Sequence, residues 1–199
     1  MKAKKCIKIF NESTALYHVY DDVNMACQSP YQEHSIDYLM FVKNWIDTVQ
    51  WHYEDIIRDP NINPAYGIQL KRKIDKSNQD RTDIVEKIDD YYIAQFQNVS
   101  YKETARINTE SPGWAVDRMS ILCLKIYHMQ EQVDRKDVDD EHKNNCQNKL
   151  NILLEQQNDL GTAFDELLEE FQNGTKKIKV YRQMKMYNDA NLNPILYKK

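Results

Sequence analysis

The sequence predicts an all-α protein, a bundle of about five helices followed by a C-terminal arm. Its 199 residues include only 4 glycines and 5 prolines, well below average usage, so few positions break a helix. Apolar residues recur three and four positions apart over long stretches, which is the spacing of one helix face. Prolines and potential N-cap residues stand between those stretches. We therefore expect one all-α domain over residues 1–199.

The first two helices are expected at residues 3–21 and 36–58. Ser35 has the side chain of an N-cap directly before the second helix. Pro60 ends that helix, because proline is tolerated only in the first turn. The first helix is supported by apolar residues at helical spacing: Cys6, Ile9, Phe10, Tyr17 and Tyr20.

The third and fourth helices are expected at residues 64–96 and 112–132. Pro64 and Pro112 fit the first turn of each, and Ser111 fits the N-cap position of the fourth. The fourth helix, "WAVDRMSILCLKIYHM", is apolar around most of its circumference, so we expect it at the centre. The third carries an apolar face made of Leu70, Ile74, Val85, Ile88 and Tyr92.

A fifth helix is expected at residues 138–173, capped by Asp137 and stopped by Gly174. Its apolar residues alternate three and four apart and form a seam that packs lengthwise on another helix. We favour a partner in the same chain, and a homodimer through this helix is the alternative. The seam consists of Cys146, Leu150, Leu153, Gln157, Leu160, Phe164, Leu167 and Phe171.

Residues 175–199 differ from the rest, because they are locally basic and carry apolar residues at even spacings. This pattern predicts a short extended arm over the bundle. Its apolar residues are Ile178, Val180, Met184 and Met186.

Charge and cysteine content predict a soluble protein of the reducing cytoplasm. The net charge of −4 is small and both signs are mixed along the chain, so we expect no nucleic-acid partner. No apolar run approaches the ~18 residues of a membrane span, and the N-terminal residues do not form a signal peptide. The four cysteines contain no C-x-x-C pair and are expected as free thiols.

Polar residues lie beside the apolar face of the second helix. His52, Asp55 and Asp59 share one stripe at spacings i, i+3 and i+7. Two carboxylates one turn apart can share a hard cation, and a histidine can act as a base.

The third and fourth helices also carry polar groups on or near apolar faces. Arg81 stands within the apolar face of the third helix, where an unpaired charge would cost several kcal/mol, so it must be paired. Further candidates on these two helices are Asn78, Asp89, Asp117, Arg118, Lys125 and His128.

These residues predict a polar centre between the second, third and fourth helices that binds or hydrolyses a small phosphate-containing molecule. His52 and Asp55 would be catalytic, while Asp55, Asp59 and Asp89 would hold Mg²⁺ or Mn²⁺. The anionic ligand would be bound by Asn78, Arg81, Arg118 and Lys125, with Asp117 and His128 beside them.

The alternative is a non-catalytic helical interaction protein. Its buried charges would be a structural network in which Asp55, Asp59, Asp89 or Asp117 neutralises Arg81 and Arg118. The seam of the fifth helix and the basic arm would then be its working surfaces.

Other chemistries have weaker support. All-α nucleotide pyrophosphatases carry E-E-x-x-E on one helix and E-x-x-D on the next, and only Glu54, Asp55 and Asp59 followed by Glu86 and Asp89 are similar. The spacing of Asp55 and Asp59 departs from that pattern. Along the sequence the five histidines do not form a spaced metal set, and no glycine-rich phosphate loop is present.

Four stretches resemble an uncharacterised bacterial family known only as a domain of unknown function. They are "NWIDTVQWHYEDIIRDP", "KRKIDKSNQDRTDIVEKID", "INTESPGWAVDRMSILCLKIYHMQEQ" and "VYRQMKMYNDANLNP". The resemblance spans nearly the whole chain and implies one helical domain, without an assigned reaction, cofactor or site.

Overall fold

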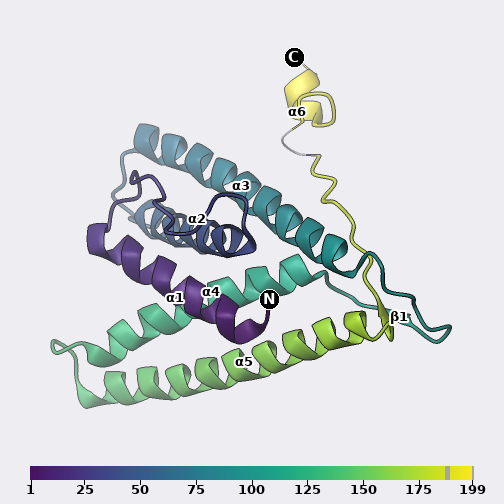
Figure 1. Cartoon of the computed structure of the whole chain (residues 1–199). Coiled ribbons are helices and arrows are strands. Elements are labelled where there is room, and N and C mark those ends of the chain that lie inside the picture. The colour runs from purple at the N-terminus through teal and green to yellow at the C-terminus, as the bar shows by residue number, and fades with distance from the viewer. Residues whose placement is uncertain (187–188, 199) are drawn as a thin grey trace.

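The computed structural model describes residues 1–186 and 189–198 and is built from long helices (Figure 1). The predicted all-α class is confirmed, and every long helix begins and ends within two residues of its expected bounds. The elements are α1 (Ala3–Tyr20), α2 (Ile36–Ile57), α3 (Pro64–Phe96), β1 (Arg106–Ile107), α4 (Pro112–Asp134), α5 (Asp140–Gln172), β2 (Lys176–Lys177) and α6 (Pro194–Tyr197).

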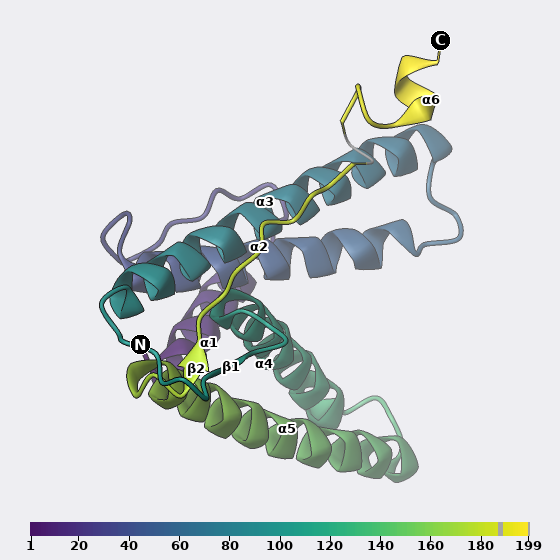
Figure 2. The same cartoon turned by 90° about the vertical axis from the view of Figure 1, so that its right-hand side faces the viewer.

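Two helical hairpins and one further helix make up the bundle. Helices α2 and α3 pack on each other, as do α4 and α5, and α1 contacts α2, α4 and α5. The two hairpins diverge from the end of the molecule that carries β1 and β2 (Figure 2). Helix α4 contacts each of the other four long helices, which confirms its expected central position.

Capping side chains fix where the helices start. Ser35 accepts a hydrogen bond from the Tyr38 amide, and Ser111 accepts one from the Trp114 amide, as expected. The expected cap of the fifth helix is wrong. Asp139 accepts from the His142 amide at 2.8 Å, whereas Asp137 pairs with Arg135.

A buried carboxylate joins the start of α4 to α3. Asp89 accepts hydrogen bonds from the Ser111 hydroxyl at 2.6 Å and from the Gly113 amide at 2.7 Å. A Cβ atom at Gly113 would lie 2.5 Å from the Val85 carbonyl oxygen, so only glycine allows this close approach. The contact sets the position of α4, and with it the polar side chains that α4 carries.

The apolar seam of α5 packs within the same chain. Helix α4 is the main neighbour of α5, and the seam residues are buried or half-buried. The polar seam residue Gln157 donates to the Cys123 sulfur of α4 at 3.3 Å. The homodimer alternative would therefore need another face of this helix.

The C-terminal arm runs back along α3, as Figure 2 shows. Strand β2 pairs in parallel with β1 after a left-handed turn at Gly174. Arg182 pairs with Asp90, and Lys185 donates to the Thr82 hydroxyl at 2.6 Å. The expected extended arm is confirmed for residues 178–186 and is wrong at α6, where Pro194–Tyr197 form a short helix, while 187–188 and 199 lie outside the described residues. None of the described helices has the length and apolar character needed to cross a membrane.

Candidate metal centre and adjoining clefts

Three histidines from three helices meet in the interior of the bundle. His18 lies in the last turn of α1, His52 on α2 and His128 on α4. One ring nitrogen of each lies within 4.8 Å of the others, and all three residues are half-buried. This histidine centre is the only such group of metal-ligating side chains among the described residues.

Second hydrogen bonds orient two of the imidazoles. His18 Nδ1 lies 2.7 Å from the Thr14 carbonyl oxygen, and His128 Nδ1 lies 2.8 Å from the Glu131 carboxylate. Both partners are acceptors, so each Nδ1 carries a proton, and in the neutral imidazole it is Nε2 that has the free lone pair. A metal-ligating histidine is oriented in the same way in known sites.

Aromatic rings fix the planes of the three imidazoles. His52 stacks on Tyr17 at 5.0 Å, His18 on Tyr127 at 4.3 Å and His128 on Trp51 at 4.9 Å between ring centroids. The imidazoles do not stack on one another but meet edge to face at interplanar angles of 65°, 69° and 77°. The rings are thus inclined to one another, with one ring nitrogen of each within 4.8 Å of the others.

The nitrogen atoms of the centre are poorly satisfied by the protein. His128 Nε2 is buried and has no hydrogen-bond partner among the described residues. His52 Nε2 lies 3.3 Å from His18 Nε2, and the described part of the chain offers it no other hydrogen-bond partner. Burial, followed by the neighbouring His18 and His128, lowers the pKa of His52 and favours its neutral form.

The geometry suits a divalent transition metal. Two nitrogens bound to one tetrahedral Zn²⁺ at about 2.0–2.1 Å are about 3.4 Å apart, close to the 3.3 Å between His18 and His52. Neutral imidazoles favour zinc and its neighbours over Mg²⁺, which prefers oxygen ligands. Three histidine ligands also leave a fourth position open, which is typical of catalytic zinc.

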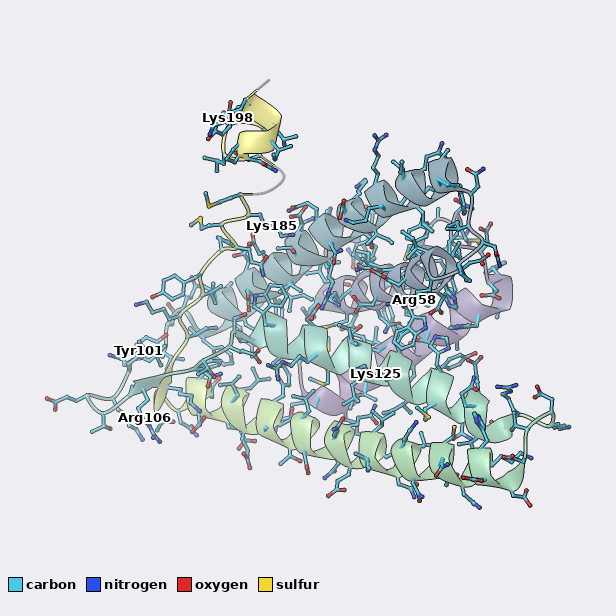
Figure 3. The ribbon with its side chains drawn as sticks, turned by 180° about the vertical axis from the view of Figure 1, so that it is seen from behind. Arg58, Tyr101, Arg106, Lys125, Lys185 and Lys198 are labelled. Carbon is cyan, nitrogen blue, oxygen red and sulfur yellow. The ribbon has the colours of Figure 1, made fainter. Side chains whose placement is uncertain are left out.

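Three adjoining clefts lie between the two hairpins, and His128 of the histidine centre lines the first of them. The first, of about 580 Å³, is lined by His128, Trp51, Asp55 and Lys125 together with apolar residues of α5. The second, of about 300 Å³, shares Trp51 and Asp55 with the first. The third, of about 790 Å³, shares Lys125 with the first. In Figure 3 Lys125 on α4 and Arg58 at the end of α2 lie on this face of the molecule.

A buried ionic network forms the wall behind the second and third clefts. Arg81 donates to Asp117 from Nε at 2.7 Å and from Nη2 at 2.5 Å. Lys43, which is 0% exposed, pairs with Asp47 and lies 3.0 Å from Asp117. The Ser120 hydroxyl donates to Asp47 at 2.6 Å. The expectation that Arg81 must be paired is thus confirmed, with Asp117 as its partner.

The two carboxylates of the network have opposite pKa shifts. Burial raises the pKa of Asp47 although Lys43 opposes it. Burial acts in the same direction on Asp117, but hydrogen bonding from Arg81 and the charge of Lys43 bring its pKa below the usual value. Asp117 is therefore the more firmly ionised of the pair.

The carboxylates predicted as metal ligands do not come together. Asp55 is exposed and lines the first and second clefts, and Asp59 caps the turn after α2 by accepting from the Asn61 amide. Asp89 accepts hydrogen bonds from the Ser111 hydroxyl and the Gly113 amide at the start of α4. No shared ion site of these three exists among the described residues. The pyrophosphatase-like arrangement is likewise not formed, because Glu86 contacts Arg182 of the arm.

The predicted anion-binding residues are split between two environments. Arg81, Arg118 and Lys125 line the third cleft, where Arg118 pairs with Glu110. Asn78 instead accepts a hydrogen bond from Gln50, and none of the three clefts has it in its lining.

Several interior residues were not predicted as a group from the sequence. No metal set was expected from the spacing of the histidines, whereas the structure brings together His18, His52 and His128, which lie 34 and 76 positions apart along the chain. Lys43 and Asp47 were also missed, although their i, i+4 spacing on α2 is a recognisable signal for an ion pair. The histidine cluster has no such local signal.

The fold and this centre define an all-α protein with a candidate metal site beside a cleft. The chain belongs to the family described as "Protein of unknown function (DUF4254)", whose model matches residues 37–180, so the resemblance seen in the sequence is confirmed. His52 and His128 lie inside the matched region, and His18 lies before it. No curated protein and no solved structure matches the chain.

Proposed function

We propose that this protein is a transition-metal-dependent hydrolase of a small phosphate-containing molecule. The observation that carries the proposal is the convergence of three oriented imidazoles, one with a buried nitrogen that has no partner within residues 1–186 and 189–198. The proposal keeps the phosphate-containing ligand expected from the sequence. It replaces Mg²⁺ or Mn²⁺ on carboxylates by a metal such as Zn²⁺ on histidines.

The reaction is hydrolysis of a phosphate ester. The water oxygen forms a new bond to phosphorus while the ester P–O bond breaks, and the proton of water passes to the leaving oxygen. A bound metal would lower the pKa of the attacking water and stabilise charge on the phosphoryl oxygens.

Residues of the first cleft would assist. Asp55, an exposed carboxylate that lines the same cleft as His128, would accept the proton of water as general base. Lys125 in the same wall can balance the phosphate charge. His52, expected from the sequence as a base, becomes a ligand in this proposal.

The test is metal binding followed by activity. Purified full-length protein stripped with a chelator should take up one Zn²⁺ or Co²⁺ per chain, and Co²⁺ should give the intense visible absorption of a tetrahedral site. Hydrolysis of a panel of phosphomonoesters and phosphodiesters should depend on that metal. His52→Gln and His128→Gln should lose both properties.

His142→Gln is the matched control, since His142 lies on α5 and contacts the Cys146 sulfur rather than the histidine centre. It should retain metal and activity. Equal metal uptake by His142→Gln and His52→Gln would contradict the proposal.

The alternative, a non-catalytic interaction protein, draws support from the buried Lys43–Asp47–Asp117–Arg81 network, which by itself is consistent with a structural role. A homodimer would belong to that alternative.

The proposed compartment is the cytoplasm, and the free thiols of the four cysteines support it.

A further inference from the structure

Arg81 lies where the second and third clefts meet and lines both of them. A guanidinium has five N–H donors in one plane, and Arg81 uses two of them on Asp117. Its Nη1 makes no hydrogen bond to any residue that the structure describes, and the side chain is 26% exposed. Arg81 therefore has donors to spare at the cleft wall.

The orientation of Arg81 is fixed from behind. Both carboxylate oxygens of Asp117 accept hydrogen bonds from Arg81, and Asp117 also forms an ion pair with the fully buried Lys43. A donor that is already held in place loses little conformational entropy when a ligand binds. Arg81 differs in this respect from Arg58 in the second cleft, whose partner Glu54 is partly exposed.

Net charge does not explain what Arg81 would bind. Within the network the charges of Lys43 and Arg81 formally balance those of Asp47 and Asp117. Attraction for a ligand must come from the directed N–H donors, which match the planar or tetrahedral oxygens of a carboxylate or phosphate.

The clefts that Arg81 lines adjoin the cleft that His128 lines. Trp51 and Asp55 line both the first cleft, where His128 lies, and the second, where Arg81 lies. Lys125 lines both the first and the third. A small molecule that spans two adjoining clefts would therefore lie beside both Arg81 and His128.

We infer that Arg81 forms an anion subsite, so that the substrate carries a second phosphate or a carboxylate in addition to the ester phosphate at the histidine centre. This inference deepens the proposed function and rests on it for the ester phosphate at the histidine centre. The subsite itself uses only Arg81 and its supports.

The experiment uses inorganic phosphate as the probe and the metal-free full-length protein, so that the histidine centre does not contribute. Binding is followed by phosphorus NMR at constant ionic strength. Arg81→Lys keeps a cation beside Asp117 but removes the spare donors in the fixed plane, and should weaken binding by about tenfold or more. Arg58→Lys, the matched control in the same cleft, should change it by less than about twofold.

A second pair of variants avoids the ion pair altogether. Ile121 lines both the second and third clefts, and Ile121→Glu should weaken phosphate binding as strongly as Arg81→Lys. Ile152→Glu adds the same charge in the first cleft and should have little effect.

Three outcomes would overturn the subsite. The first is absence of phosphate binding by the wild-type protein, and the second is equal binding by the Arg81→Lys and Arg58→Lys variants. The third is loss of binding in metal-free His52→Gln, because the anion would then lie at the histidine centre. If metal uptake fails while phosphate still binds through Arg81, the proposed function fails and the subsite stands.

Discussion

His18 Nε2 and His52 Nε2 lie 3.3 Å apart although the residues are 34 positions apart in the sequence. The contact joins the last turn of α1 to α2, and His128 closes the group from α4. Imidazoles from three helices therefore meet at one point, and Glu131 orients the third of them.

Glu131 should control metal affinity without touching the metal. Its carboxylate accepts from His128 Nδ1 at 2.8 Å, which fixes the ring and raises the basicity of Nε2. Glu131→Gln should weaken Zn²⁺ binding by about 10- to 100-fold, measured by competition with a chromophoric chelator. Gln132→Glu, a neighbouring change, should leave affinity within about threefold. Equal affinities of wild type and Glu131→Gln would remove the positioning role.

The metal-free protein should lose stability below about pH 6.5. The pKa of His52 is lowered in the folded state from its ordinary value of 6.5, so the unfolded chain binds its proton first. The contribution of His52 to the free energy of unfolding is complete above pH 6.5 and is lost as the pH falls from there through the lowered pKa of the folded state. Urea unfolding across this pH range should show a fall in unfolding free energy for the wild-type protein and a smaller fall for His52→Gln. Identical pH profiles would contradict the assignment.

The buried network should be far more sensitive to mutation than the surface pairs. Asp117→Ala leaves Lys43 and Arg81 with one carboxylate between them, and should cost about 3–5 kcal/mol of unfolding free energy. Glu110→Ala, which removes the exposed partner of Arg118, should cost less than about 1 kcal/mol. Chemical denaturation of both variants makes the comparison, and similar costs would show that the network is not a structural support.

Gly113 should tolerate no side chain. A Cβ there would lie 2.5 Å from the Val85 carbonyl oxygen and 2.8 Å from the Asp89 carboxyl carbon, so α4 must move away from α3. Gly113→Ala should destabilise the protein by about 1–3 kcal/mol. Gly67→Ala has space at 3.8 Å and should be neutral or stabilising by up to about 1 kcal/mol. Thermal unfolding of the two variants makes the comparison, and equal midpoints would refute the close approach of α4 to α3 at Gly113.

The cysteines should be unreactive at neutral pH. Burial raises the pKa of Cys6 and of Cys123 to about 12, and that of Cys27 to about 11. Native protein should react slowly with a thiol reagent, and denatured protein quickly. Because these folded pKa values are raised, their contribution to stability is complete below about pH 9 and is lost as the pH rises toward about 12. A thiol that reacts at the rate of free cysteine in native protein would contradict the burial.

The sequence by itself determined the helices, because the signals that place them are local. The caps Ser35 and Ser111, the first-turn prolines and the apolar periodicity all act within a few residues. One cap was placed wrongly, at Asp137 in place of Asp139. Positions 134–141 contain five acidic residues, so composition could not separate the candidate caps.

Part of the polar interior was also accessible from the sequence. A guanidinium on an apolar face has to be paired, so Arg81 was expected to have a carboxylate partner, and it pairs with Asp117. The sequence could not choose Asp117 over Asp55 or Asp89, because that choice depends on how α4 lies against α3 and on the glycine at its start.

The histidine centre was decided by tertiary structure alone. Its ligands lie on three helices, and no spacing along the chain relates His18 to His52 or His128. Only the crossing of α1, α2 and α4 brings the three rings together, and only the stacked Tyr17, Tyr127 and Trp51 set their planes. Local patterns specify helices, whereas a site built across helices exists only once they are packed.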